Sequence, residues 1–255
     1  RKYIIIDDET VYVGGAGITD SFHGALAWRE TIAEIKGAVV IDWHELFRDG
    51  FQRWSNNVVP ETINFPRGPN KIQARLTYTS GGQHLEIKKV LLNRMNNCQQ
   101  SIWFASAYFI PSRKIRRALQ RAAQEGRDVR LLLPGPVIDH PSVRYASRRY
   151  YAGLLRFGVR IFEYQGRFTH TKVVLIDDWF TIGSSNVDRW NFRWNLEANL
   201  DVNDMHSAKE LRAILTTDFE NCEEIHYTVW VNRSRLLRLK EWIWGKVDLW
   251  LTKYI

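Results

Sequence analysis

One phrase occurs twice in the chain and constrains the fold more than any other feature. The first copy, in residues 1–15, reads RKYIIIDDETVYVGG, and the second, in residues 171–186, reads TKVVLIDDWFTIGSSN. In each copy a Lys precedes an Asp by five residues across an apolar run, and a turn of small residues follows. β-rich runs on both sides of an Asp-Asp turn predict a buried hairpin. We therefore expect the same hairpin in each of two similar halves.

Between the two hairpins, apolar strand-like and helix-like patterns alternate. A polar, proline-containing stretch from about Ser55 to Gly82 predicts the connection between the halves. Alternating strands and helices predict a three-layer α/β arrangement. The elements that we expect in the second half are a helix near 84–98, a strand at 102–105, a basic helix from 112 to about 126, a strand at 129–133, a helix around 142–157 and a strand at 159–163.

The first half has no such series of elements before its hairpin, and the sequence starts abruptly in a strand. We therefore expect an incomplete first half that belongs to a longer protein. The expected division is residues 1–70 for the end of the first half, 71–225 for the second half and 226–255 for a basic, Trp-rich tail.

Composition limits the class of protein and of partner. A chain of 255 residues with 45% hydrophobic residues is long enough to bury a core. A net charge of +8 indicates affinity for an anionic partner, which could be a nucleic acid, a membrane surface or a phosphorylated substrate. Cys98 and Cys222 have the spacing of neither a metal site nor a disulfide framework, so we expect packed thiols. No apolar run is long enough to cross a bilayer.

A group of polar residues around the second hairpin suits phosphoryl chemistry. His170 and Lys172 share one face of a strand, because side chains alternate every two residues. Such an imidazole can attack or protonate while the ammonium neutralises a phosphate oxygen. Each residue taken alone has an ordinary structural interpretation, but the combination favours the functional one. The other members are Asp177 at the hairpin turn, Ser184 and Asn186 in the following turn, and Glu197 beyond it.

These residues resemble the phospholipase D superfamily, whose members carry two His-x-Lys-x4-Asp motifs that meet in one active site. The stretch HTKVVLIDDWFTIGSSNVDRWNFRWNLEANLDV matches the second motif in full, and RKYIIIDDETVYVGGAGITD matches the first from its middle residue onward. The resemblance implies a duplicated three-layer α/β/α sandwich with an incomplete first half. It also implies a histidine immediately before Arg1. By resemblance, His170, Lys172, Asp177, Lys2 and Asp7 are catalytic, and Ser184, Asn186, Glu197 and Glu30 bind or orient.

Two positions of the first half need separate comment. Gly17 stands where the family usually has Asn, which removes one amide donor. Glu30 looks like the counterpart of Glu197 in the first half. The resemblance implies that such carboxylates orient the catalytic imidazoles.

Within the superfamily, VRYASRRYYAGLLRFGVRIFEYQGRFTHTKVVLIDD and SAYFIPS look like bacterial cardiolipin synthases. This implies phosphatidyl transfer through a phosphohistidine, with anionic phospholipids (phosphatidylglycerol and cardiolipin) as partners. The first-motif histidine would be the nucleophile and His170 the acid and base. The resemblance implies no metal or other cofactor, no nucleic-acid partner, and a peripheral location on the cytoplasmic side of the bacterial inner membrane.

The tail has its own pattern. Arg and Lys outnumber acidic residues there, and three tryptophans could anchor it, as in a helix that lies in a membrane interface. The alternative is an amphipathic helix packed on the protein's own core. The residues that recur at helical spacing are Leu236, Leu239, Ile243, Val247, Trp250 and Tyr254.

Two other functions stay open at this point. The chain could belong to a phosphodiesterase nuclease of the same superfamily, whose basic charge holds a nucleic-acid backbone. It could also be a degenerate, non-catalytic half-enzyme, given Gly17 and the absent first histidine. We favour a truncated first half over a degenerate one, because Lys2, Asp7 and Glu30 are all still in place.

Overall fold

The computed structural model describes residues 1–55, 72–80, 85–188 and 195–254, without the side chains of 245–246 and 248–254. Most of the predicted connection between the halves lies outside these residues. Its end, however, is a strand: residues 73–78 form β4 at the edge of the larger sheet. This strand alternates polar and apolar residues, and its apolar residues Ala74, Leu76 and Tyr78 pack on the core, but the polar, proline-containing stretch before it concealed the pattern.

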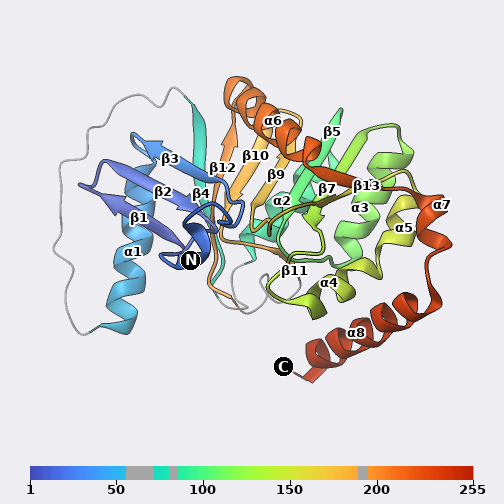
Figure 1. Ribbon diagram of the computed structural model, residues 1–255. Coiled ribbons are helices and arrows are strands. Elements are labelled where there is room, and N and C mark those ends of the chain that lie inside the picture. Colours follow the sequence, from blue (N-terminus) through green and yellow to red (C-terminus); the bar gives the residue numbers. More distant parts are fainter. Residues whose placement is uncertain (56–71, 81–84, 189–194, 255) are drawn as a thin grey trace.

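The second half contains a mixed sheet of eight strands in the order β13-β8-β7-β5-β9-β10-β12-β4 (Figure 1). The central strands β5, β7 and β8 run parallel to one another, and the other neighbouring pairs are antiparallel. The predicted α/β class is thus confirmed. The strands are β4 (Gln73–Tyr78), β5 (Ser101–Ser106), β7 (Asp128–Pro134), β8 (Arg160–Tyr164), β9 (Lys172–Ile176), β10 (Trp179–Gly183), β12 (Ala198–Asn203) and β13 (Cys222–Ile225).

The first half contributes a sheet of three antiparallel strands, β1 (Tyr3–Ile6), β2 (Thr10–Gly14) and β3 (Ile32–Lys36), followed by α1 (Val40–Trp54). This order repeats in the second half as β9, β10, β12 and α6 (Met205–Glu220). A hairpin, a third strand and a helix therefore occur twice, and the repeated phrase predicts the hairpin.

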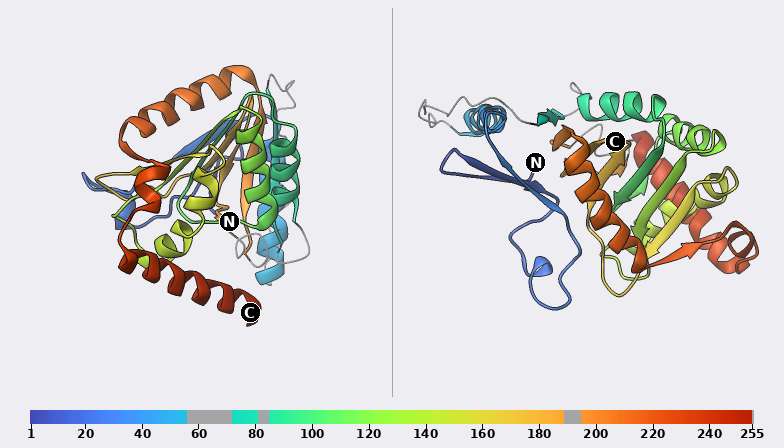
Figure 2. Two further views of the ribbon diagram at one scale, coloured as in Figure 1. Left: turned by 90° about the vertical axis from the view of Figure 1, so that its right-hand side faces the viewer. Right: turned by 90° about the horizontal axis from the view of Figure 1, so that it is seen from above.

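Helices cover both faces of the larger sheet (Figure 2). The two helices α2 and α3 lie on one face, and α6 lies on the other. Two further short strands, β6 (Phe109–Ile110) and β11 (Val187–Asp188), pair with each other. The remaining helices are η1 (Asp20–Phe22), α2 (Glu86–Asn96), α3 (Arg113–Gln124), α4 (Pro141–Arg148), α5 (Tyr151–Leu155), α7 (Tyr227–Val231) and α8 (Arg235–Tyr254).

The core lies on both sides of the sheet, and β9 shows why its sequence is continuously apolar. Val174 and Ile176 pack into the cluster beneath α2 and α3, whereas Val173 and Leu175 pack into the cluster on the α6 face. A strand buried on both faces needs apolar residues at every position. The second cluster also contains Trp43 of α1, so the two halves share one core.

One expected helix is divided in two. The pattern around 142–157 forms α4 and α5, which are separated at Arg149 and Tyr150. At the break the N–H of Tyr150 bonds the carbonyl of Ser147, three residues back, which tightens the turn. Amphipathic periodicity continues through such a turn and so does not reveal it.

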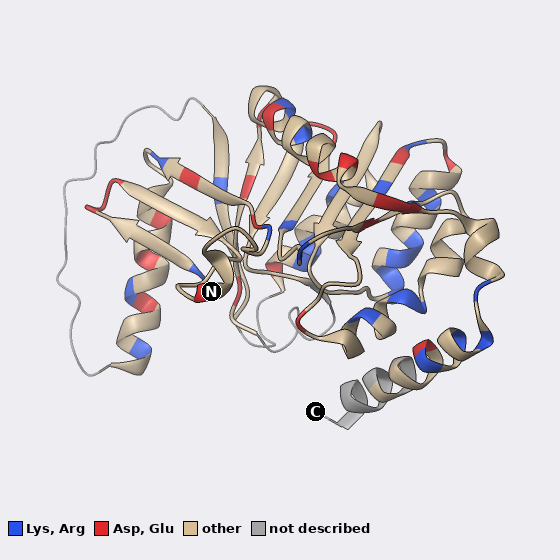
Figure 3. Cartoon of the chain, viewed as in Figure 1, with Lys and Arg blue, Asp and Glu red and all other residues tan. Residues whose placement is uncertain are grey.

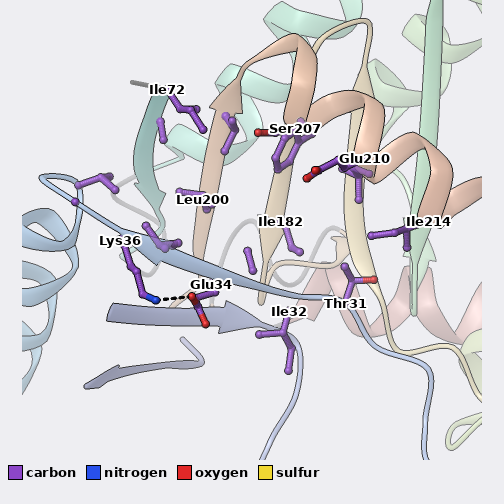
Figure 4. A pocket seen from close by; sticks show the side chains of 18 of the residues that line it. Thr31, Ile32, Glu34, Lys36, Ile72, Ile182, Leu200, Ser207, Glu210 and Ile214 are labelled. Carbon is purple, nitrogen blue, oxygen red and sulfur yellow. Dashed lines mark ion pairs between the residues drawn. The ribbon is translucent and has the colours of Figure 1, made fainter. Parts of the chain in front are cut away.

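An apolar cavity of about 660 Å³ lies between the halves (Figure 4). Its walls come from β3, from the edge of the larger sheet and from α6. Among the described residues that line it, none belongs to the predicted site.

The tail forms α7 and α8, and α8 packs across α4 at the opposite end of the molecule from α6 (Figures 1 and 2). No helix within the described residues is long and apolar enough to cross a membrane.

Candidate active site

The candidate site forms where a loop of the first half pairs with the segment that enters β9. The N–H of His170 donates to the carbonyl of Arg29, and the N–H of Arg29 donates to the carbonyl of Phe168, both at 2.8 Å. Arg29 thereby forms a β-bridge with Thr169. The bridge brings Glu30 of the first half next to His170 of the second half.

His170 is held by a carboxylate of the other half. Its Nδ1 lies 2.7 Å from Oε2 of Glu30, and both side chains are buried. The other oxygen of Glu30 accepts from the N–H of Thr31 at 3.0 Å, which fixes the carboxylate. With Nδ1 bonded to Glu30, Nε2 is the nitrogen left to face a substrate, and Nζ of Lys172 lies 3.1 Å from it. This geometry fits the predicted orienting role of Glu30.

The pKa of His170 lies below its ordinary value of 6.5, and burial is the main cause. The hydrogen bond to Glu30 opposes this shift, and the nearby charge of Lys172 adds to it. An anionic phosphate beside the ring would stabilise the charged imidazolium and raise the pKa again. The site therefore favours a neutral imidazole until an anion binds.

Lys172 is buried beside His170. Its Nζ donates to the carbonyl of His170 at 2.6 Å and lies 4.0 Å from Oε2 of Glu30. Burial lowers the pKa of Lys172 to about 8, although the charge of Glu30 opposes the shift. A buried ammonium with one carboxylate at this distance can be stabilised further by a second anion.

Lys2, from the first half, acts on the same site electrostatically, because its charge adds to burial in lowering the pKa of both His170 and Lys172. The Nζ of Lys2 donates to the carbonyl of Gly15 at 3.0 Å. A Cβ on Gly15 would lie 2.8 Å from Nζ of Lys172 and 2.3 Å from Oε2 of Glu30. Only glycine leaves room for these groups. A Cβ on Gly17 would lie 3.8 Å from Nζ of Lys2. An asparagine at this position, in place of Gly17, would therefore have its side-chain amide beside the lysine.

The second half supplies a matching set of side chains. Glu197 precedes β12 as Glu30 precedes β3, and it accepts a hydrogen bond from Oγ of Ser184. Burial raises the pKa of Glu197, and the bond from Ser184 opposes this. The α-amino group of Arg1 donates to the carbonyl of Leu196, next to Glu197, at 2.6 Å.

Asn186 is also buried, and its Oδ1 has no hydrogen-bond partner within the described part of the chain. Its amide can therefore bind a ligand. Among the described residues, no group of three or more His, Cys, Asp and Glu is placed to hold a metal ion.

The structure separates Asp177 and Asp7 from this site. Asp177 lies at the β9–β10 turn, at the far end of β9 from His170. One carboxylate oxygen accepts from the N–H groups of Gln100 and Ser101, at 2.8 and 3.0 Å, and the other accepts from Gln99 at 2.8 Å. Burial raises the pKa of Asp177, but these backbone donors outweigh it and hold the pKa below the ordinary value. Its geometry is that of a structural residue.

Asp7 lies at the equivalent turn of the first hairpin, at the far end of β1 from Lys2. Both aspartates have φ of 52°, a left-handed conformation that Asp tolerates better than most residues. The positions of the two aspartates in the motif thus reflect the turn geometry rather than proximity to the site.

Sequence reasoning missed two features. Aromatic rings surround His170, with centroids 5.4 Å from Trp28, 5.6 Å from Phe22 and 5.7 Å from Phe168. Arg29 also forms a bidentate ion pair with Asp218 of α6, with both distances 2.8 Å. This pair connects the halves directly behind the site. The stretch AWRE at residues 27–30 contains Trp28 and Arg29, but no local pattern indicates their distant partners.

Comparisons with known proteins identify the family of the chain. A family model described as "Cardiolipin synthase, PLD-like domain" matches residues 91–219, about half of the chain. A cardiolipin synthase of Alkalihalophilus pseudofirmus is 32% identical over 94% of this chain and 50% of its own length. Cardiolipin synthase 2 of Bacillus anthracis is 35% identical over 89% of this chain and 46% of its own length. The chain thus spans about half the length of the curated relatives that it matches.

Solved structures share the fold. A phosphatidylserine synthase of Haemophilus influenzae matches 96% of this chain and 68% of its own, with a TM-score of 0.73 and 14% identity. Nuc of Salmonella typhimurium, a phospholipase D family member, matches 61% of this chain and 99% of its own, with a TM-score of 0.52 and 18% identity. From the family match and the shared fold, we conclude that this chain belongs to the cardiolipin synthase family of phospholipase D-like proteins.

Proposed function

We propose that the chain is part of a phosphatidyl transferase that makes cardiolipin and glycerol from two molecules of phosphatidylglycerol. The observation that carries the proposal is the buried group of His170, Glu30 and Lys172, with Lys2 bonded to the nearby carbonyl of Gly15. It combines an oriented imidazole with two ammonium groups at one place, as phosphoryl transfer requires. The names of the relatives support the same reaction.

In the first step of the proposed reaction, a histidine nitrogen attacks the phosphorus of phosphatidylglycerol. The bond to the glycerol headgroup oxygen breaks, and His170 gives its Nε2 proton to that oxygen. In the second step, a headgroup hydroxyl of another phosphatidylglycerol attacks the phosphorus and passes its proton to His170. The phosphorus–nitrogen bond breaks and cardiolipin leaves. Lys172 and Lys2 stabilise the negative charge on the phosphoryl oxygens in both steps.

For the nucleophile, we propose a histidine before Arg1 in the complete protein. The duplication supports it, since Lys2 corresponds to Lys172 and the residue two places before Lys172 is His170. The backbone at Arg1 also passes next to Glu197, the counterpart of the carboxylate that orients His170. By resemblance, Asn186 and Ser184 complete the phosphate site. We further propose that the protein acts as a peripheral protein on the cytoplasmic side of the bacterial inner membrane.

The test compares the full-length enzyme with two histidine variants, using phosphatidylglycerol in mixed micelles and measuring cardiolipin and glycerol. His170→Ala should lower the rate by about 10²–10⁴-fold, the loss typical of a general acid and base. His206→Ala, which removes an exposed histidine of α6, is the matched control and should leave the rate unchanged. A chelator should have no effect.

Normal synthesis by His170→Ala would refute the assignment. If the wild-type protein released phosphatidic acid or cleaved DNA instead of making cardiolipin, the hydrolytic alternatives would replace the transferase.

A further inference from the structure

The helix α8 is attached to the protein by a buried group of charged side chains. Glu241, on α8, is only 2% exposed and pairs with Arg148 of α4 at 3.3 Å and with Arg233. Arg148 continues to Glu163 of β8 at 3.6 Å, and Arg144 of α4 bonds the same carboxylate at 2.6 Å. Each of the two carboxylates is thus paired with two guanidinium groups, and the three guanidinium groups leave the cluster with one excess positive charge.

Aromatic contacts reinforce this attachment. The guanidinium groups of Arg148 and Arg233 lie over the ring of Trp230, 4.6 and 4.0 Å from its centroid. Trp230 itself is buried on α7 and packs on Tyr151. Cations over an indole face are attracted by its quadrupole. A polar face of α8 therefore fixes the helix to the protein.

The opposite face of α8 is apolar and exposed. Residues 236, 239, 243 and 247 follow one another at intervals of three or four and share one face, roughly opposite Glu241. An ordinary surface helix turns its apolar stripe toward the protein. In α8 the apolar stripe faces solvent and the side that carries Glu241 faces the protein. The exposed fractions are 73% for Leu236, 52% for Leu239, 60% for the neighbouring Trp242, 45% for Ile243 and 37% for Val247, while the side chains of Trp250 and Tyr254 lie outside the described residues.

We propose that α8 is a docked membrane-binding helix, whose apolar stripe enters the interface of an anionic bilayer while the Glu241 cluster holds its other side on the protein. The inference deepens the proposed function, on which it rests, by naming the surface that meets the lipid. Charge selects the partner, because Arg235, Arg238 and Lys240 are exposed on the same helix and would lie at the level of anionic headgroups. Figure 3 shows Lys and Arg along the first part of α8.

The docking also fixes the position of the catalytic site relative to the bilayer. The helix under α8 is α4, and His140 immediately precedes it. The ring of His140 lies 6.0 Å from that of Tyr108, which stacks on Phe168 at 6.4 Å, and Phe168 lies 5.7 Å from His170. A continuous set of packed elements therefore joins the membrane-binding helix to the imidazole.

The first test replaces two residues of the exposed stripe, Leu236→Asp with Ile243→Asp, and measures sedimentation with vesicles of phosphatidylglycerol and phosphatidylcholine. Vesicle affinity should fall at least about tenfold, because two inserting side chains become charged. The control is Met205→Asp with Ile214→Asp on α6, whose exposed fractions of 72% and 43% match those of Leu236 and Ile243. It should bind vesicles as the wild type does.

The second test separates docking from insertion. Glu241→Gln removes the charge at the centre of the cluster, so hydrogen exchange in α8 should become faster while vesicle affinity stays within about twofold, since the stripe is intact. Unchanged vesicle binding by the Leu236 and Ile243 double variant would overturn the proposal. So would a change of that variant from dimer to monomer, which would make a second copy the occupant of the stripe.

These binding measurements do not require turnover. His170→Ala should bind vesicles like the wild type, so failure of the catalytic proposal and failure of the membrane-binding proposal give different results.

Discussion

Replacing Asp177 by Asn separates a structural role of this motif residue from a catalytic one. The substitution keeps the size of the side chain and the tolerance for φ of 52°, since Asn also adopts left-handed backbone conformations. It removes the charge and turns one acceptor oxygen into an NH₂ donor. If the remaining oxygen keeps the bonds from Gln100 and Ser101, the NH₂ group faces the N–H of Gln99.

The geometry sets the size of the effect. A hydrogen bond to a charged group contributes about 1.5–3 kcal/mol, and one such bond is lost here. Asp177 is partly exposed, so water can reach the freed N–H, and we expect a loss of about 2 kcal/mol in the free energy of unfolding. For a chain of this size each kcal/mol shifts the melting temperature by about 2–4 °C. The variant should therefore melt about 4–8 °C below the wild type.

The assay is thermal and chemical denaturation of both proteins, with Asp7→Asn as the matched control. Asp7 has the same φ in the equivalent turn but is exposed, so its substitution should change stability by less than about 0.5 kcal/mol. Because the folded-state pKa of Asp177 is depressed, its contribution is present above the ordinary value of 3.8 and is lost as pH falls through the folded-state pKa. The difference between wild type and Asp177→Asn should shrink in acid.

The reasoning would be refuted by unchanged stability together with lost binding of orthophosphate, measured by calorimetry at a temperature where both proteins are folded. That result would place the Asp177 carboxylate in the functional site rather than in the turn.

Two further predictions concern the site. Glu30→Gln in the full-length enzyme should lower kcat by about 10²–10⁴-fold and move the pH dependence that is due to His170 to lower pH, because Glu30 raises the pKa of that imidazole; an unchanged pH–rate profile would contradict the orienting role. Because burial lowers the pKa of Lys172 to about 8, its charge is lost above that pH. Orthophosphate binding should therefore weaken as pH rises through about 8, and constant affinity from pH 7 to 10 would count against a charged Lys172 as the phosphate ligand.

The sequence predicted best the elements whose cause is local. Hairpins around Asp177 and Asp7 follow from apolar runs on both sides of a turn, and α3 begins where Ser112 caps it. It predicted worst the elements whose cause is tertiary. The strand β4 alternates polar and apolar residues, but this short pattern follows a polar, proline-containing stretch, and its pairing with β12 identifies it as a strand. The stripe of α8 indicates an amphipathic helix, but which face packs on the protein depends on Arg148, about ninety residues earlier in the sequence.

The same distinction applies to the site. Alternation on a strand placed His170 and Lys172 side by side, and the repeat placed Lys2 with them. Spacing within a motif also suggested that Asp177 belongs to the site, but five residues of extended chain separate a strand's two ends by about 16 Å. Residues of one sequence motif, such as His170 and Asp177, can thus lie at opposite ends of one strand.

The crossed pairing of Glu30 with His170 explains why the two halves must fold together. The first half carries Glu30 just before its third strand, and the second half carries His170 and Lys172 at the start of its hairpin, so neither half alone forms this pair of imidazole and carboxylate. The backbone bridge between Arg29 and Thr169 sets the spacing of this contact, and the ion pair of Arg29 with Asp218 sets its orientation. Breaking that buried ion pair would leave an unpaired charge behind the imidazole and also release the loop that carries Glu30. Because Glu30 and His170 come from different halves, this pair forms only when the two halves associate correctly.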